Sequence, residues 1–478
     1  MFNFPDLTPL LCPRSIAILG ASNDLRKVGG MPIQLLRANG FEGAVYPVHL
    51  QSIEIQGLRA YPSLNAIGKP IDLVIIALPA AACELAIAQV CACGARAAII
   101  LSSGFAETNE AGVAMQTRLA QQAFSAGVLI LGPNCLGAMN LRGKVFSTFS
   151  PMALAGAPKP GRVALVSQSG AVGGYAFAMA KQQNLGLSHW ITTGNEAGVQ
   201  VADALHWLAF DPDTDLIMTY IEGARDMVRL RAALQANKKA GKAVVMMKVG
   251  FTEAGRKAAL AHTASHTGDD DEFAASLSEF GVHRVANLSE LIRITRVLDF
   301  AHSLSQLNIC DKAPSTAQPQ STALLSISGG AGIMMADRAE QLGLSLPTFP
   351  HDAAQRLQVA ISFSSAANPI DVTGQVFSQP EVLTQAIEDA ASCGLYTNLV
   401  IFLAGAALIP SFWAKLQTCL SDLRNRSSNV NTVFCGIVSA EQTAWLESHG
   451  CLVTSDPVDA VDVVALLSGH RLPYRIKS

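Results

Sequence analysis

A histidine on a loop of small residues is the side chain in this sequence best suited to chemistry. His262 lies in the Gly- and Ala-rich stretch Gly250–Gly268, which follows the apolar run Ala243–Lys248 and precedes an acidic helix start at Asp269. The apolar run has the pattern of a buried strand, and ligands bind beyond the carboxyl ends of strands in open α/β sheets. If His262 is a nucleophile, the sequence predicts a phosphoryl-transfer enzyme.

Other polar residues follow neighbouring strands of the same predicted sheet. Ser167-Gln168-Ser169-Gly170 separates a strand from a helix, so its N–H groups and the helix dipole favour a phosphate, although Ser167 or Ser169 serving only as an N-cap explains it equally well. Asn195 and Glu222 follow the next two strands. Glu222 is suited to accept a hydrogen bond from one ring nitrogen of His262, which makes the other nitrogen more basic.

Each of these residues also has an ordinary interpretation. A lone loop histidine is most often exposed or a helix cap, and His266 competes with His262 for any role. A glutamate at the place of Glu222 is most often a solvated loop carboxylate. Convergence of four loops on one sheet edge favours a shared site over four separate coincidences.

Composition excludes several classes of protein. The chain has 478 residues, net charge −3, a pI near 6.4 and ten scattered cysteines without metal-type spacing. Its apolar stretches carry charges, as Ile71–Ile100 carries Asp72, Glu84 and Arg96. We therefore expect no nucleic-acid partner, no membrane span, no metal site and no secretory signal, and a reduced, cytoplasmic location.

Strand-like and helix-like patterns alternate throughout, which predicts an α/β protein of about three domains. Boundaries at Pro151–Gly161 and Cys310–Ser321 divide it into residues 1–145, 151–308 and 320–478. The expected strands are Ser15–Leu19, Ala44–Val48, Leu73–Leu78, Ala97–Leu101 and Val128–Leu131; Val163–Val166, Leu187–Thr192, Leu216–Ile221, Ala243–Lys248 and His283–Val285; and Ala323–Ile327, Leu344–Leu346, Leu399–Leu403, Thr432–Ile437 and Leu452–Val453.

The second and third domains share an internal pattern. Each opens with a strand and a Gly turn, beginning at Val166 and at Ile327, and the helix that follows ends in Leu-Gly-Leu-Ser, at 185–188 and at 342–345. This order and spacing predict two flavodoxin-like domains in tandem.

The first domain has a nucleotide-type turn, Gly20-Ala21-Ser22, after its first strand. Ser22 replaces the second glycine of a dinucleotide fingerprint, and the second strand ends without an acid for a ribose hydroxyl, so a mononucleotide or CoA-like ligand fits better. A plain structural turn is the alternative. Further loops at the same expected edge contain Leu78, Pro79, Ser102, Ser103, Gly104 and Asn134.

Several motifs together resemble the NDP-forming acyl-CoA synthetases, relatives of the succinyl-CoA synthetase α subunit. In the second domain these are Val166-Ser-Gln-Ser-Gly-Ala-Val-Gly, Thr193-Gly-Asn-Glu, Tyr220-Ile-Glu-Gly and Glu253-Ala-Gly-Arg-Lys-Ala-Ala-Leu-Ala-His-Thr. In the first they are Pro13-Arg-Ser-Ile-Ala-Ile-Leu-Gly-Ala-Ser, Gly104-Phe-Ala-Glu and Gly132-Pro-Asn-Cys-Leu-Gly. In the third they are Ser328-Gly-Gly-Ala-Gly and Asn368-Pro-Ile-Asp-Val-Thr-Gly.

The resemblance implies a Rossmann-like CoA-binding domain followed by two flavodoxin-like domains. It also implies that acyl-CoA and phosphate give acyl phosphate and CoA, that His262 takes the phosphoryl group, and that a nucleoside diphosphate receives it. Glu222 matches the family's glutamate beside the phosphohistidine, and Ser167–Gly170 its phosphate-binding helix start. CoA is expected across Gly20–Ser22, Leu78-Pro79, Ser102–Gly104 and Asn134.

The chain departs from the family pattern in four places. It has no region resembling the ATP-grasp domain, so a partner chain is expected to hold ATP or ADP with Mg²⁺, in a hetero-oligomer or homodimer. His49-Leu50 stands where the family has Asn-Pro, and Gln51–Gln56 lacks a basic residue for CoA. Ala264 replaces a glycine two residues after the nucleophile, and Gly250-Phe-Thr replaces Gly-Arg-Ser.

Two functions follow from these patterns. The first is a catalytic α-type subunit acting on acyl-CoA and carboxylic acid, and the second is a non-catalytic regulatory module that binds CoA or acyl-CoA. A nicotinamide dehydrogenase is a distant third.

Overall fold

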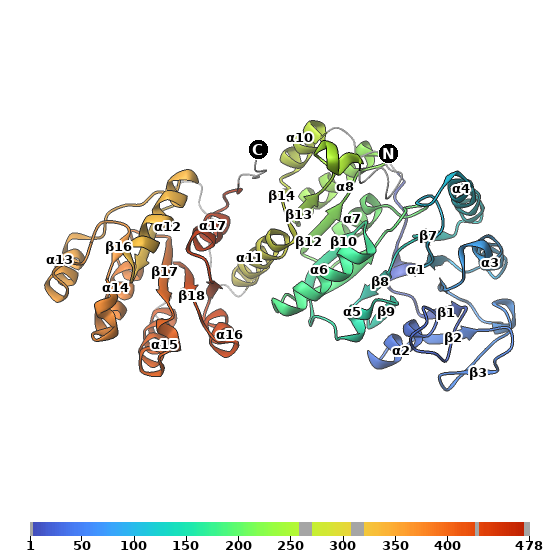
Figure 1. Ribbon diagram of the computed structural model, residues 1–478, viewed down its shortest axis with the longest axis horizontal. Helices are drawn as coiled ribbons and strands as arrows, with labels where there is room; N and C mark the ends of the chain where they lie inside the picture. The colour runs from blue at the N-terminus through green and yellow to red at the C-terminus, as the bar shows by residue number, and fades with distance from the viewer. Residues whose placement is uncertain (1–2, 258–269, 307–319, 426–429, 473–478) are drawn as a thin grey trace. The chain divides into compact units, whose positions relative to one another are not determined.

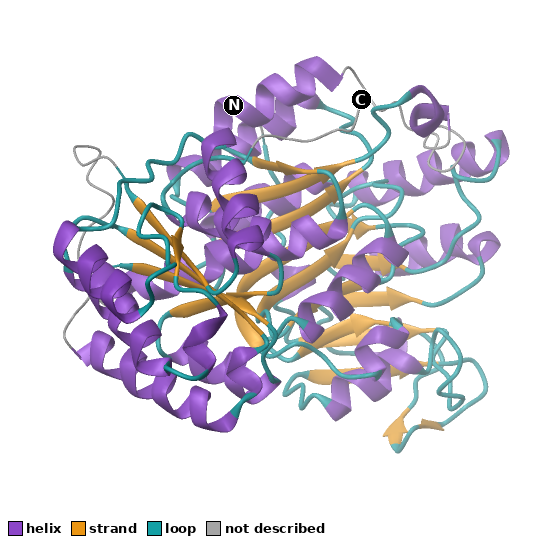
Figure 2. Ribbon diagram, turned by 60° about the vertical axis from the view of Figure 1, so that its left-hand side comes forward, coloured by secondary structure: helices purple, strands orange, loops and turns teal. Residues whose placement is uncertain are grey.

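A computed structural model describes residues 3–257, 270–306, 320–425 and 430–472 (Figure 1). The chain divides into two compact units, the first extending through Thr295 and the second beginning at Arg296. The division falls within helix α11 (Leu288–Gln306). Each unit is built from sheets of mainly parallel strands with helices on both faces, so the α/β prediction is confirmed (Figure 2).

The first sheet lies in the N-terminal part of the first unit. Its parallel strands, in spatial order, are β2 (Ala44–Val48), β1 (Ser15–Leu19), β5 (Leu73–Ile76), β6 (Ala97–Ile100) and β7 (Leu129–Leu131). Between β2 and β5 lie a hairpin of β3 (Glu54–Ile55) and β4 (Leu58–Arg59) and a 3₁₀ turn, η1 (Asn65–Ile67). In this sheet β1 lies between β2 and β5, so the strand order reverses beside β1. This reversal is the topological switch point, where ligands bind in open α/β sheets.

Alternating side chains supply both faces of this sheet with apolar contacts. On β1, Ile16 and Ile18 belong to one core cluster and Ala17 to another. Helices α1 (Thr8–Leu11) and α2 (Met31–Ala38) cover the first face, and α3 (Ala80–Ala92) and α4 (Glu110–Ser125) cover the second. Burial on both faces explains the continuous apolar strands of the sequence.

The second sheet completes the first unit. Its strands, in spatial order, are β14 (His283–Val285), β13 (Ala243–Lys248), β12 (Leu216–Ile221), β10 (Pro160–Ser167), β11 (Leu187–Thr192), β8 (Gly137–Asn140) and β9 (Val145–Thr148). The helices of this domain are α5 (Pro151–Leu154), α6 (Gly170–Gln182), α7 (Val201–Phe210), α8 (Met227–Lys239) and α10 (Asp270–Phe280). The antiparallel hairpin of β8 and β9 was not predicted, and it adds residues 137–148 to this sheet.

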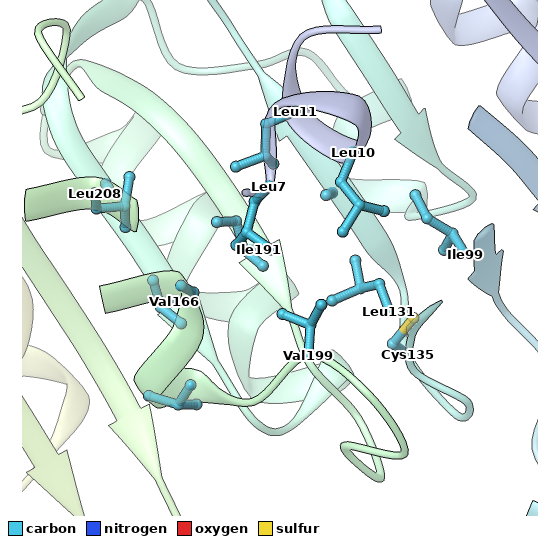
Figure 3. Packing of buried hydrophobic residues seen from close by; sticks show 14 of the residues in the cluster. Leu7, Leu10, Leu11, Ile99, Leu131, Cys135, Val166, Ile191, Val199 and Leu208 are labelled. Carbon is cyan, nitrogen blue, oxygen red and sulfur yellow. The ribbon is translucent and has the colours of Figure 1, made fainter. Parts of the chain in front are cut away.

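A continuous apolar core joins the two sheets of the first unit. Leu7, Leu10 and Leu11, in and before α1, lie close to Ile99 of the first sheet and Ile191 of the second (Figure 3). All five side chains are at most 1% exposed. Because this core is shared, the loops at the ends of the two sheets are held in a fixed relation.

The third sheet forms the second unit. Its parallel strands, in spatial order, are β16 (Ile370–Asp371), β15 (Thr322–Ser326), β17 (Asn398–Ala404), β18 (Asn431–Gly436) and β19 (Cys451–Thr454). Helices α13 (His351–Ala360), α14 (Pro380–Ser392), α15 (Pro410–Asn425) and α16 (Ala440–Ser448) contribute to one core cluster, while α12 (Gly329–Gln341) and α17 (Pro457–Leu467) contact each other and are joined by the buried ion pair Arg338–Asp462. Two 3₁₀ turns, η2 (Gly374–Phe377) and η3 (Ala406–Leu408), follow β16 and β17.

The tandem relationship of the second and third sheets is visible in their details. Among the parallel strands of each sheet, the first in the chain lies between the second and the third, as in flavodoxin: β10 lies between β11 and β12, and β15 lies between β16 and β17. Ser167 Oγ donates to the carbonyl of Ser169, and Ser326 Oγ donates to the carbonyl of Ser328, both at 2.7 Å. Two turns with the same internal hydrogen bond support the predicted pair of flavodoxin-like domains.

The prediction of a strand at Leu344–Leu346 was wrong. The position forms only an isolated bridge between Ser345 and Ser321, and Ile370–Asp371 is the strand beside β15. Three apolar or small residues cannot distinguish a strand from a short extended loop. The predicted domain limits remain a prediction, and residues 307–319 of the expected linker lie outside the described residues.

None of the helices in the described part of the chain combines the length and hydropathy that a membrane crossing requires. Nor do the described residues gather three or more potential metal ligands of the His, Cys, Asp or Glu type.

Candidate functional site

The structure brings together the predicted loops at the carboxyl edge of the first sheet. Gly20 follows β1 with φ +88°, and a Cβ there would lie 2.6 Å from the carbonyl oxygen of Ala77, so only glycine fits. Ser102 Oγ donates to the carbonyl of Leu78, and the Asn134 N–H donates to the carbonyl of Ser102 at 2.8 Å. Hydrogen bonds therefore join the loops after β5, β6 and β7 into one rim, and the Gly20 turn after β1 packs against it.

The turn between β10 and α6 is a helix N-terminus with an internal cap. Ser169 is the N-cap, and its Oγ accepts from Val172 N–H at 3.3 Å, so of the two proposed caps Ser169 is the one used. Ser167 is fully buried and bonds to the Ser169 carbonyl. The helix that starts at Gly170 has 13 residues, and its first-turn N–H groups have no partner within the helix. This end favours a bound anion.

Gln168 fastens this turn to the loop that carries Glu222. Its Oε1 accepts from the backbone N–H of Glu222 at 2.5 Å and of Gly223 at 3.2 Å, and its Nε2 donates to the Gly223 carbonyl at 2.8 Å. The two loops follow β10 and β12, which are adjacent in the sheet. A role for Gln168 as a phosphate ligand stays a prediction, whereas its part in holding the two loops together is evident.

Glu222 is a buried carboxylate. It is 6% exposed, so the alternative of a solvated loop residue is wrong. Burial raises the pKa of the Tyr220 phenol, and the neighbouring Glu222 carboxylate raises it further. A buried carboxylate can accept a hydrogen bond from the N–H of an imidazole and so fix the orientation of the ring.

His262 lies outside the described residues, as do Ala264 and His266, but both flanks of its segment are described. Lys248 ends β13, and Asp270 begins α10 beyond the segment. Lys248 Nζ is fully buried, 3.5 Å from Asp270 Oδ1, and Arg284 also binds Asp270 at 2.8 Å. Lys248 pairs in register with Ile221, the residue before Glu222. The His262 segment thus starts beside Glu222, on the neighbouring strand.

Asn195 makes contacts that the sequence did not predict. Its side chain is 4% exposed and bonds to three residues of the first domain, Asn134, Gln116 and Glu107. Its backbone N–H donates to the Pro133 carbonyl at 2.9 Å. A phosphate-binding role for Asn195 stays a prediction, and its amide joins the two domains in the structure.

Gln116 and Arg225 were missed as site-forming residues, and Glu107 was included only as part of the motif Gly104-Phe-Ala-Glu, without a role of its own. Arg225 Nη2 donates to the Asn195 carbonyl at 2.6 Å. Glu107 follows a Gly turn after a strand, a position from which a carboxylate can bond to the preceding N–H groups, and this signal was available in the sequence. Gln116 lies within α4, and nothing in its sequence neighbourhood distinguishes it from a surface glutamine.

Glu196 is a buried carboxyl group at the same turn. It has φ +56°, and its Oε1 accepts from Val201 N–H at 2.8 Å and from Thr193 Oγ1 at 3.1 Å. Burial raises its pKa from 4.5 to about 7, although these hydrogen bonds and Arg225 act in the opposite direction. Near neutral pH, therefore, Glu196 changes its charge within a rigid turn.

Replacing Glu196 with glutamine is expected to remove a pH dependence of stability. The neutral carboxyl is favoured in the folded state, so its contribution is full below pH 4.5 and is lost as the pH rises through about 7. At about 1.4 kcal/mol per pKa unit, the wild type loses roughly 3 kcal/mol relative to Glu196→Gln across this window. Urea unfolding of both proteins from pH 4 to 8 measures the difference, and parallel curves would contradict it.

The fold and the site define a class of protein. A family model described as "CoA binding domain" matches residues 14–140, and one described as "Succinyl-CoA ligase like flavodoxin domain" matches residues 160–298. The first matched range holds the rim around Gly20, and the second holds the helix start at Gly170 and the buried Glu222. The chain is an acid–thiol ligase that binds CoA.

Relatives of known function give the family. The chain is 30% identical to the α subunit of acetate–CoA ligase (ADP-forming) I of Pyrococcus furiosus, over 96% of this chain and 97% of the relative. It is 34% identical to acetate–CoA ligase (ADP-forming) I of Archaeoglobus fulgidus over 77% of this chain, but it spans only 51% of that longer protein. The acetyl-coenzyme A synthetase 1 of Candidatus Korarchaeum cryptofilum, solved with phosphate and ADP, superposes with a TM-score of 0.81 at 25% identity, over 97% of this chain and 98% of that one. The chain belongs to the family of NDP-forming acyl-CoA synthetases, as an α-type subunit.

Proposed function

We propose that this subunit links acyl transfer to phosphoryl transfer in three reversible steps. A phosphate oxygen attacks the thioester carbon of acyl-CoA, the C–S bond breaks, and CoA leaves as a thiol with the proton from phosphate. A ring nitrogen of His262 then attacks the phosphorus, and the bond to the acyl oxygen breaks, releasing the carboxylate. Finally a nucleoside diphosphate oxygen takes the phosphoryl group as the P–N bond breaks.

One observation carries the proposal. Gln168 bonds the backbone of Glu222 and Gly223 to the turn that begins α6, beside the strand that leads into the His262 segment. A helix start that favours an anion and a buried carboxylate are thereby held at one sheet edge. A phosphohistidine needs both, because the helix N–H groups stabilise the phosphoryl oxygens and the carboxylate holds the imidazole.

The proposed roles follow this geometry. The turn residues Ser167–Gly170 hold phosphate through backbone N–H groups, with Asn195 at the boundary between the domains. Glu222 accepts the N–H of the His262 ring opposite the reacting nitrogen. CoA is proposed to lie across the rim around Gly20, and the close packing of Gly20 on the carbonyl of Ala77 helps to fix the shape of this rim.

A separate ATP-grasp chain is proposed to supply the nucleotide with Mg²⁺. The P. furiosus relative is named as a subunit α, which implies at least one further subunit in that enzyme. We propose the same arrangement here, in a cytoplasmic hetero-oligomer, with acetate or a related carboxylic acid as the product released from the acyl group.

Phosphorylation of the chain by its partner tests the proposal. The purified protein is mixed with its cognate ATP-grasp chain, Mg²⁺ and ATP labelled at the γ-phosphate, and protein-bound label is measured before and after acid treatment. We expect acid-labile label that ADP removes. A regulatory module would bind CoA without acquiring label, and label that is absent with an active partner would refute the catalytic function.

A further inference from the structure

Four polar side chains meet where the two domains of the first unit adjoin. Asn195 lies at the centre of this cluster, the Asn195 junction, and the other members are Glu107, Gln116 and Asn134. Asn195 Nδ2 donates to Gln116 Oε1 at 3.0 Å and also to Glu107, while its Oδ1 accepts from Asn134 Nδ2 at 3.1 Å. Asn195 and Gln116 are 4% and 7% exposed, so little water competes for these bonds.

Glu107 bonds to the CoA side of the junction as well. Its carboxylate accepts from the N–H groups of Gly104 and Phe105, the latter at 3.2 Å from Oε2 and 3.3 Å from Oε1. Gly104 has φ +106°, and the loop that Glu107 closes contains Ser102, whose Oγ bonds to Leu78. The shape of the predicted CoA-binding loop therefore depends on one carboxylate.

The charge of Glu107 strengthens both sets of bonds. Burial alone would raise the pKa of the Glu107 carboxyl, but the hydrogen bonds from Asn195 and from the loop N–H groups lower it below its ordinary value. Glu107 is thus ionised near neutral pH, and hydrogen bonds to an ionised group are about twice as strong as neutral ones.

Hydrogen bonds also connect the Asn195 junction to the phosphate turn. The Asn195 carbonyl accepts from Arg225 at 2.6 Å, and the N–H of Gly194 donates to the carbonyl of Gln168 at 3.0 Å. Gln168 in turn holds the backbone of Glu222. Hydrogen bonds therefore connect the loop at Gly104 through Glu107 to Asn195, and the adjacent residue Gly194 is bonded to the phosphate turn.

We propose that Glu107 is a positioning residue for the attack of phosphate on acyl-CoA, fixing the CoA-binding loop relative to the phosphate turn. This inference rests on the proposed function. The thioester and the phosphate are held by different domains, so their separation depends on the junction. Phosphoryl transfer between the nucleotide and His262 is proposed to use the second domain and the partner chain, and it does not depend on the CoA-binding loop.

Comparing CoA release with labelling from ATP distinguishes a positioning role of Glu107 from a general structural role. In the complex with the ATP-grasp chain, the Glu107→Gln protein is assayed for phosphate-dependent release of CoA from acetyl-CoA, and for acid-labile labelling from ATP. Glutamine keeps the size of the side chain, but its NH₂ cannot accept a hydrogen bond. We expect kcat/KM for CoA release to fall by about ten- to a hundredfold, since small misplacements of reactants cost rates of this order, while labelling stays within about twofold.

Glu110→Gln is the matched control, because Glu110 is an exposed carboxylate three residues away at the start of α4. It should leave both rates unchanged. Taking the ratio of the two rates on one preparation cancels any loss of folded enzyme. An unchanged ratio in Glu107→Gln, whether both rates fall or neither does, would overturn the inference. A wild-type complex that neither labels nor releases CoA would refute the proposed function instead, and the inference with it.

Discussion

Replacing His262 with alanine is expected to abolish acid-labile phosphorylation of this chain. Alanine has no nucleophilic nitrogen, so no P–N bond can form, and removing a covalent nucleophile typically costs roughly 10³-fold or more in rate. The segment of His262 begins after Lys248, next to the strand that leads to Glu222. We therefore expect the label from γ-labelled ATP, in the presence of the partner chain, to fall to background.

A second histidine in the same segment provides the control. His266→Ala should keep the label, because Glu222 and the α6 start are proposed to serve His262 alone. Phosphate-dependent release of CoA from acetyl-CoA should survive in His262→Ala, since acyl phosphate forms before the histidine reacts. Label that persists in His262→Ala but disappears in His266→Ala would show that His266 is the nucleophile.

The Gly194→Ala substitution is expected to destabilise the first unit strongly at the boundary between its two domains. Gly194 has φ +58°, and a Cβ there would lie 2.3 Å from the carbonyl oxygen of Pro133 and 2.5 Å from that of Asn134. Left-handed backbone costs a non-glycine residue about 1–2 kcal/mol, and overpacking adds typically 1–3 kcal/mol. The obstructing atoms are backbone, so they cannot rotate away. We expect a total loss of about 2–5 kcal/mol in the free energy of unfolding of the first unit.

The Gly241→Ala variant separates the cost of the left-handed backbone from the cost of overpacking. Gly241 has a similar φ of +70°, but nothing lies within 4 Å of the added Cβ. It should lose only the backbone contribution of about 1–2 kcal/mol. Thermal unfolding of both variants should show a midpoint several degrees lower for Gly194→Ala. Equal midpoints would mean that the contact with the first domain relaxes at little cost.

Local sequence patterns were sufficient to predict most strands and the loops that follow them. Leu187–Thr192 and Ala243–Lys248 have the predicted bounds, because each is a short stretch rich in apolar, aromatic or β-branched residues between turn residues. The β8–β9 hairpin was missed because Gly137–Asn140 has a weak strand pattern of its own. It becomes a strand by pairing with β11, which is distant in sequence.

The candidate site also has some features that local sequence predicted and others that only the fold determined. That a Ser-Gln-Ser-Gly turn starts a helix followed from residue types alone, and Ser169 is its N-cap. The burial of Glu222, by contrast, depends on which loops lie beside it. The bonds that the backbone N–H groups of Glu222 and Gly223 donate to Gln168 join residues 54 and 55 positions apart. No local pattern specifies such a contact.

The sequence by itself determined the alternation of strands and helices, the turns at Gly20 and Gly170, and the residue types available for phosphoryl transfer, because these depend on local periodicity and backbone freedom. Only the tertiary structure decided that Asn195 bonds to Glu107 across two domains and that Glu196 is buried with a raised pKa. Hydrogen-bond partners and desolvation are set by segments that folding brings together from distant parts of the chain.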